Sequence, residues 1–236
     1  MQPEYSIILT VYKRNHLQEQ IERVISQQGI IIKNIFVFQN ESHVDVSDVI
    51  EKYQHYGVKH IHNKNVNTKF HGRFTVPLWC PTQYWAIFDD DTMPNPQWLL
   101  YAAQKSVEYN GAIIGANGRW ADKPGGVGDG VAVAKDTLVD TVGHCWVFPQ
   151  ERIYTMFRDP SFTLDNAEDI HFCCAAQYYD GVECIVPMCS PQDISKWPDT
   201  NTMLGQDEHA TYKNPEHKGL RDQTYNYWKN KGWEAL

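Results

Sequence analysis

Residues 84–99 read YWAIFDDDTMPNPQWL, a short apolar run that ends in three consecutive aspartates. The segment from Tyr84 to Phe88 has the length and composition of a buried strand. Asn95 and Pro96 then mark the start of a helix, because proline is well suited to the first helical position. We therefore predict that Asp89, Asp90 and Asp91 lie in the loop at the carboxyl end of a buried strand.

The same alternation of strand and helix continues on both sides of this segment. Apolar runs predict further strands at 5–11, 34–39, 58–62, 112–116, 139–148 and 182–187, and amphipathic stretches predict helices at 15–28, 49–56, 95–110 and from Asp165 onward. Strands that alternate with helices form parallel sheets with right-handed crossovers. We therefore expect an α/β fold of the Rossmann-like kind, with a mostly parallel sheet flanked by helices and a smaller second subregion.

The length of 236 residues favours a single domain. Within it we distinguish residues 1–120, residues 121–190 and a polar, irregular tail at 191–236 with a short helix near 223–231. The formal net charge of −8, without a cluster of Lys and Arg, argues against nucleic acid as a partner. No apolar run approaches the roughly 18 residues of a transmembrane helix, and the first residues lack the order of a signal peptide. These features predict a cytoplasmic protein without a transmembrane segment.

Polar side chains follow four of the predicted strands. Ligands of such sheets bind beyond the carboxyl ends of the strands, so these side chains are candidates for one shared binding site. We expect it to include Thr10, Tyr12 and Arg14 after the first strand, Gln39, Asn40 and Glu41 after the second, Lys69 and Arg73 after the third, and Asp89, Asp90 and Asp91 after the fourth. For any one of these residues the alternative is an ordinary solvated loop position.

The three adjacent carboxylates repel one another, and a divalent cation would remove that repulsion. Mg²⁺ and Mn²⁺ bind hard oxygen ligands and keep coordination positions open for phosphate oxygens. We therefore predict a divalent metal site on this aspartate cluster; the alternative is a solvated acidic turn. His209 and His217 in the tail are weaker candidates, because they would have to reach back to the same ion.

A second acidic segment, Asp165 to Asp169, opens a predicted helix. Asp165 and Glu168 fit the pattern of a capping box, which explains both without any function. Asp169 shares a helical face with Phe172, which is expected to face the core. A carboxylate at the rim of a core is suited to accept a proton from a bound hydroxyl, so Asp169 is our candidate general base and Glu168 the second choice.

The segments SIILTVYKRN, IFVFQNES, YWAIFDDDTMPNPQWL and NAEDIHF, in that order, resemble the GT-A glycosyltransferases. The resemblance covers residues 5–179. It is closest to the family-2-like and exostosin-like branches, and within them to the small glycosyltransferase domain of chlorella viruses that decorates the major capsid protein. It implies that the three aspartates are the family's DxD motif, with Asp91 as the first-choice metal ligand beside Asp89. It also implies that Thr10 and residues 39–41 hold uridine and that Asp169 is the base of an inverting reaction.

The resemblance further implies a UDP-linked sugar as donor, rhamnosyl or glucosyl, with Mn²⁺ or Mg²⁺ as cofactor and a glycan or glycoprotein as acceptor. The location would be the host cytoplasm if the protein is viral. Residues 1–120 would then bind the nucleotide sugar, and residues 121–190 would bind the acceptor and carry the catalytic carboxylates. Residues 125–130, GGVGDG, lack the ending of a P-loop, and we interpret them as a mobile loop on the acceptor side.

Two other functions fit parts of the same pattern. A sugar-phosphate nucleotidyltransferase also combines an α/β sheet with acidic metal ligands, but it usually has a glycine-rich turn after the first strand, and residues 10–15 contain no glycine. A non-catalytic module that binds glycans or nucleotides is the third reading. The sequence also lacks the Gln-x-x-Arg-Trp motif of processive family-2 enzymes, which argues against polymer synthesis.

Overall fold

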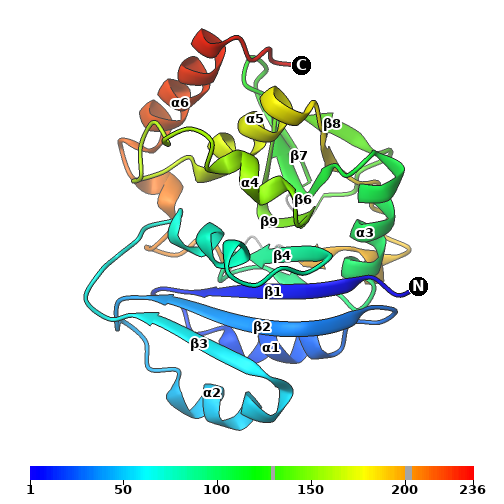
Figure 1. The fold of residues 1–236 in the computed structure, drawn as a ribbon, viewed down its shortest axis with the longest axis vertical. Helices are drawn as coiled ribbons and strands as arrows, with labels where there is room; N and C mark the ends of the chain where they lie inside the picture. The colour runs from blue at the N-terminus through cyan, green and yellow to red at the C-terminus, as the bar shows by residue number, and fades with distance from the viewer. Residues whose placement is uncertain (129–130, 200–203) are drawn as a thin grey trace.

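The computed structural model describes residues 1–128, 131–199 and 204–236. Within them, a nine-stranded sheet has the order β3-β2-β1-β4-β9-β6-β10-β8, and β7 pairs with β6 at its side (Figure 1). Its strands are β1 (Glu4–Val11), β2 (Ile31–Asn40), β3 (Val58–Asn63), β4 (Tyr84–Phe88), β6 (Ile113–Arg119), β7 (Gly126–Gly128), β8 (Thr137–Val139), β9 (Thr141–Pro149) and β10 (Cys184–Val186). A second, two-stranded sheet joins β5 (Met93–Pro94) to β11 (Pro198–Asp199).

The main sheet is mixed, with a parallel half that follows the prediction. Strands β1, β2, β3 and β4 run parallel to one another. Strand β9 is antiparallel to both of its neighbours, β4 and β6, while β10 is parallel to β6. The predicted α/β architecture is therefore confirmed, but the sheet is mixed instead of mostly parallel, because β7, β8 and β9 pair antiparallel with their neighbours.

One predicted strand is wrong. The apolar run at 139–148 was expected to form a single strand, but β8 ends at Val139 and β9 begins at Thr141, and the two lie in different parts of the sheet. Asp140 separates them. Its buried carboxylate accepts hydrogen bonds from the backbone N–H groups of Ala121 and Leu236, so the chain turns there instead of continuing.

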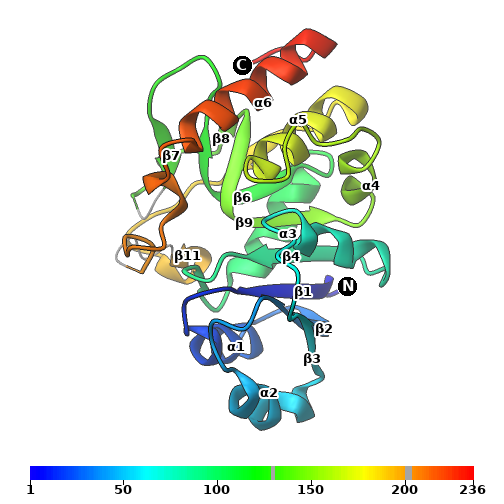
Figure 2. The same ribbon diagram turned by 90° about the vertical axis from the view of Figure 1, so that its left-hand side faces the viewer.

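Helices cover both faces of the sheet (Figures 1 and 2). They are α1 (Leu17–Ile25), α2 (Ser47–Tyr53), α3 (Trp98–Glu108), α4 (Arg152–Met156), α5 (Glu168–Asp180) and α6 (His217–Lys231), with short 3-10 helices η1 (Gln54–Tyr56), η2 (Gly72–Leu78), η3 (Ile194–Lys196) and η4 (Thr211–Lys213). Along β1, Ile7 and Leu9 pack with α1 and α3, whereas Ile8 belongs to the cluster that contains Phe172 of α5. This alternation is what a strand buried on both faces requires.

The tail is more ordered than predicted. Helix α6 has 15 residues and lies against α5, at the end of the molecule opposite α2 (Figure 1). Thr224, Tyr225 and Trp228 form its buried side, and Trp228 packs in a third cluster with Ile170 and Cys174 of α5. The sequence predicted only a short helix because most other residues of HKGLRDQTYNYWKNK are polar. The helix buries only one narrow stripe of its surface, so its apolar periodicity is weak.

Part of the predicted loop at 125–130 forms β7, which ends at Gly128, and its last two residues, Asp129 and Gly130, lie outside the described residues. Among the helices that the structure describes, none has the length and apolar character that crossing a bilayer requires.

Candidate active site

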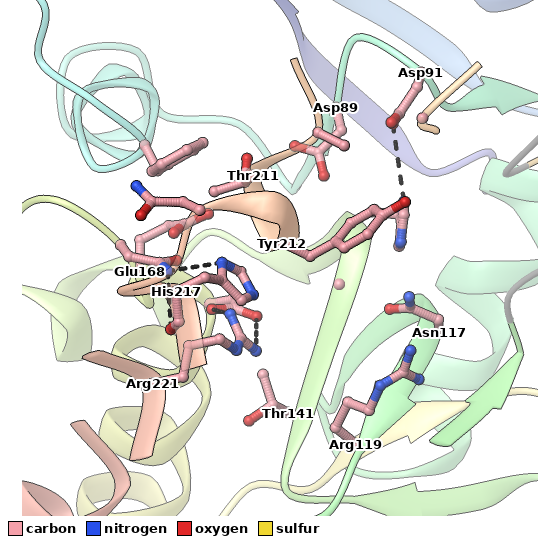
Figure 3. A pocket seen from close by; sticks show the side chains of 18 of the residues that line it. Asp89, Asp91, Asn117, Arg119, Thr141, Glu168, Thr211, Tyr212, His217 and Arg221 are labelled. Carbon is pink, nitrogen blue, oxygen red and sulfur yellow. Dashed lines mark hydrogen bonds and ion pairs between the residues drawn. The ribbon is translucent and has the colours of Figure 1, made fainter. Parts of the chain in front are cut away.

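A cleft of about 1650 Å³ opens at the carboxyl ends of the parallel strands. Its walls come from the loops after β1, β3 and β4, the start of β9, the amino end of α5 and the segment from Gly205 to Tyr225. Figure 3 shows Asp89 and Asp91 on one side, Asn117 and Arg119 across from them, and Tyr212 between. The cleft brings together most of the predicted site residues: Thr10, Tyr12, Arg14, Asn40, Lys69, Arg73, Asp89, Asp90, Asp91, Glu168 and Asp169.

Gln39 and Glu41 are the two predicted residues that are not among those lining the cleft. Gln39 is fully buried; its amide donates to Val44 O at 2.7 Å, and its Oε1 lies 2.8 Å from His60 Nε2. Glu41 has a left-handed backbone, with φ of 58°, and its carboxylate accepts from Asn67 at 2.8 Å. Both side chains therefore support the loops behind the cleft.

The first group in the cleft is a candidate metal site. One ligand atom each from Asp89, Asp91 and His144 lies within 4.8 Å of the others. Strand β9 brings His144 to this place, because it pairs antiparallel with β4 and the backbone N–H of Asp89 donates to His144 O at 3.0 Å. Burial raises the pKa of Asp91, but His144 and Arg14 outweigh it and hold that pKa below its usual value. Asp91 is thus ionised at neutral pH, as a ligand of a divalent cation would have to be.

Arg14 lies beside this group and binds three carboxylates. Its Nη1 is 2.6 Å from Asp90 and 3.3 Å from Asp91, while its Nε and Nη2 form two parallel bonds of 2.7 and 2.8 Å to Asp207. Burial raises the pKa of Asp90 to about 6 despite the opposite charge of Arg14. One guanidinium thus faces three carboxylates, and a divalent cation bound beside them would offset this excess of negative charge.

Arg73 connects the aspartates to the amino end of α5. This residue is buried, and its Nη1 binds Asp89 and, at 3.0 Å, Thr10 Oγ1. Its Nη2 binds Glu168 at 3.0 Å, and its guanidinium lies over the ring of Trp146 at 4.8 Å. Arg73 thus holds the two acidic segments of the cleft at a fixed separation.

Glu168 and Asp169 are adjacent, yet their surroundings differ. Burial, and after it the charge of Asp169, raises the pKa of Glu168 to about 7, although Arg73 acts in the opposite direction. Asp169 binds Arg221 of α6 through two parallel bonds of 2.9 and 2.7 Å.

The predicted capping box is wrong: Ala167 precedes the first turn without a side-chain cap, and Asp165 bonds through its own N–H to Thr163.

The remaining predicted residues lie at the β1 and β3 side of the cleft. Thr10 donates to Phe88 O at 2.8 Å, and the ring of Tyr12 meets that of His43 edge to face. Asn40 donates to Lys69 O at 3.0 Å and accepts from Thr68, so it shapes the loop after β3. Lys69 is 3.7 Å from Asp165 across the cleft mouth.

Sequence reasoning missed residues that lie beside the acidic groups of the site, among them His144, Asp207 and Arg221. No local motif marks them, since each reaches the cleft from a segment far along the chain. Of the tail histidines, His217 lines the cleft but lies 2.9 Å from the Asn166 amide, and His209 lines it near Glu208. Among the described residues, the histidine grouped with the aspartates is His144.

A family model described as "Glycosyl transferase family 2" matches residues 6–185. No curated protein sequence matches the chain. Among solved structures, it is similar to the mannosyltransferase PcManGT from Pyrobaculum calidifontis in complex with GDP-Man and Mn²⁺, with 15% identity and a TM-score of 0.58 over 80% of this chain and 55% of that one. It is also similar to S. aureus TarS, with 15% identity and a TM-score of 0.57 over 97% of this chain and 43% of that one. The two structures share the fold, and the chain spans about half of their length.

Proposed function

The chain belongs to glycosyl transferase family 2, and we propose that it transfers a sugar from a nucleoside diphosphate donor to a hydroxyl group of a glycan or glycoprotein. The observation that carries this proposal is the convergence of three groups in one cleft: the Asp89, Asp91 and His144 cluster, the arginines Arg14 and Arg73, and the Glu168–Asp169 pair. A sugar transfer needs groups that bind the diphosphate, groups that neutralise its charge as it departs, and a base that accepts the proton of the acceptor hydroxyl.

The residues of the candidate metal site fit a divalent cation. The two carboxylates offer hard oxygen ligands, and the imidazole offers a nitrogen ligand that Mn²⁺ accepts. Around them, negatively charged carboxylates outnumber guanidinium groups. When bound there, the cation would neutralise charge on the departing diphosphate. Asp89, Asp91 and His144 would hold it, in agreement with the Mn²⁺ present in the PcManGT complex.

In the proposed reaction, the nucleotide lies against Thr10, Tyr12, Asn40 and Lys69. Arg14 orients the diphosphate beside the aspartates. Asp169 accepts the proton of the acceptor hydroxyl, the oxygen of that hydroxyl forms the new bond to the anomeric carbon, and the bond from that carbon to the diphosphate oxygen breaks. Attack in line with the departing group inverts the anomeric configuration.

A chelator experiment tests the donor site. Nucleotide and Mn²⁺ together are expected to raise the thermal midpoint, because a ligand at about a hundred times its Kd stabilises the native state by about 2.7 kcal/mol. EDTA and Asp91→Asn should each remove this joint shift, whereas the control Asp193→Asn, on an exposed turn outside the cleft, should keep it. A nucleotide shift that EDTA leaves unchanged would contradict the metal site.

The identities of donor and acceptor are finer proposals. We propose a UDP-sugar, with rhamnose or glucose as the sugar, and the same thermal assay with GDP tests this choice against the donor of the mannosyltransferase. That the acceptor is a capsid glycoprotein of a virus stays a prediction. Stabilisation by GDP and Mn²⁺ without any by UDP would reject the uridine donor while leaving sugar transfer in place.

A further inference from the structure

The two carboxylates at the amino end of α5 are held by arginines from two different elements, η2 and α6. Arg73 of η2 binds Glu168 through one bond of 3.0 Å, and it also binds Asp89. Arg221 of α6 binds both oxygens of Asp169, at 2.9 and 2.7 Å. The side chains of Asp169 and Arg221 are 11% and 21% exposed, against 8% and 3% for Glu168 and Arg73, so the second pair is the more accessible of the two from the cleft.

Arg221 comes from a part of the chain that the family match does not cover. The match ends at residue 185, whereas α6 begins at His217. Helix α6 is nevertheless fixed against α5 and β9 by contacts that do not involve Arg221. Trp228 is fully buried against the rings of His171 and Tyr179, and the hydroxyl of Tyr225 lies 2.6 Å from Thr141 Oγ1. The helix therefore presents Arg221 to Asp169 from a rigid base.

We propose that Arg221 is a positioning residue for the transfer reaction: its guanidinium fixes the plane of the Asp169 carboxylate so that one oxygen faces the acceptor hydroxyl. This inference rests on the proposed function. An unheld aspartate in a cleft of about 1650 Å³ would rotate among several rotamers. Two parallel N–H···O bonds remove that freedom and leave each oxygen a second lone pair for the acceptor proton.

The alternative is that Arg221 blocks the base and must leave before the reaction. The two ideas predict opposite effects of removing the guanidinium. A positioning role predicts slower transfer, since a base misplaced by about 1 Å can cost a hundredfold in rate. A blocking role predicts transfer at the wild-type rate or faster.

The test compares Arg221→Ala and Arg221→Lys with the wild type and with a matched control. Lys229→Ala removes another ion pair from the same helix, that of Lys229 with Asp122 near the protein surface. We expect Arg221→Ala to lower kcat about a hundredfold while the joint thermal shift from nucleotide and Mn²⁺ stays unchanged. Arg221→Lys should recover part of the loss, because an ammonium group restores the charge but not the second bond. Lys229→Ala should transfer at the wild-type rate.

Chemical rescue separates positioning from a merely structural role. Millimolar guanidinium ion, far below denaturing levels, should restore part of the rate of Arg221→Ala and none of the rate of Asp169→Asn. Arg221→Ala at or above the wild-type rate overturns the inference, and so does a slow variant that neither guanidinium nor lysine improves. A wild-type protein that binds nucleotide and Mn²⁺ but transfers no sugar overturns the proposed function itself, before any variant is compared.

Discussion

Single residues in the cleft act as a chain of alternating charge. Asp207 binds Arg14, which binds Asp90 and Asp91, and a parallel path leads from Asp89 through Arg73 to Glu168. Arg14 and Arg73 are each shared by at least two carboxylates, so no single pair of theirs can be removed without changing the charge balance of the others. Burial raises the pKa of Glu168 from the ordinary 4.5 to about 7, the larger of the two increases among these carboxylates, beside that of Asp90 to about 6.

Glu168→Gln should change how stability depends on pH. The native state of the wild type binds the Glu168 proton more tightly than the unfolded state does, and this difference stabilises the native state. The stabilisation has its full size below pH 4.5 and is lost as the pH rises to about 7. The glutamine variant lacks this loss. Relative to the wild type, it should gain on the order of 2 kcal/mol between pH 5 and pH 8, measured by urea unfolding without metal.

The comparison between variants isolates Glu168 from other groups. Burial lowers the pKa of His71 to about 4, which acts with the opposite sign over nearly the same pH range, but this contribution is common to both proteins and cancels. Asp165→Asn, which alters an exposed carboxylate just before α5, is the control and should follow the wild type. Curves for Glu168→Gln and the wild type that stay parallel from pH 5 to pH 8 would contradict the raised pKa.

The parts of the site that the sequence predicted are the parts that are local. Asp89 to Asp91 follow a strand directly, and Glu168 and Asp169 open a helix, so their positions depend only on neighbouring residues. His144 joins the aspartates because β9 inserts between β4 and β6, and Arg221 joins because α6 packs on α5. Neither the sheet order nor that helix contact has a signal in the local pattern, which is why these partners could not be predicted.

At the scale of elements, apolar runs located the strands well but polar caps misplaced the helix starts. Strand β4 was predicted to the residue because all five of its side chains are buried. Helices α1, α3 and α5 begin two or three residues after the predicted Asn15, Asn95 and Asp165, and none of the three has a side-chain cap. Tertiary contacts fix these starts instead: Asn95, for example, binds Arg23 and Ile194 O.

Two glycines should respond in opposite ways to the same change. In β6, a Cβ added at Gly115 would lie 2.3 Å from the Cβ of Val142 in β9, so Gly115→Ala should force the two strands apart and destabilise the protein by about 1–3 kcal/mol. In α6, Gly219 has nothing within 4 Å of that position, so Gly219→Ala should stabilise it by about 0.5–1 kcal/mol. Urea unfolding measures both. A destabilised Gly219→Ala would mean that α6 is not helical at this position.

At the scale of the whole molecule, the cleft is closed by the part of the chain beyond the family match. Residues 205–225 contribute Asp207, which binds Arg14 beside the aspartates, and Arg221, which binds Asp169. Gly205 passes so close to Asp91 that a Cβ there would lie 2.5 Å from its Oδ2. The parallel half of the sheet and the C-terminal segment therefore build one site together, and the third core cluster, around Trp228, is what holds the segment in place.

Trp228→Ala tests whether that cluster supports the site. The indole is fully buried, and no hydrogen bond to its Nε1 is found among the described residues, so the substitution removes packing together with the contact of Lys231 with the ring. We expect a loss of about 3–5 kcal/mol in the free energy of unfolding, against about 0.5 kcal/mol or less for the control Trp79→Ala, whose side chain is exposed. Below its unfolding midpoint, the Trp228→Ala protein should still bind nucleotide and Mn²⁺, because β1, which carries Thr10, and β4, which precedes Asp89, pack in the other two clusters. Its transfer rate should fall, because α6 no longer presents Arg221 to Asp169 from a fixed position. A variant that loses this much stability yet transfers sugar at the wild-type rate would show that the cleft works without the packing of α6.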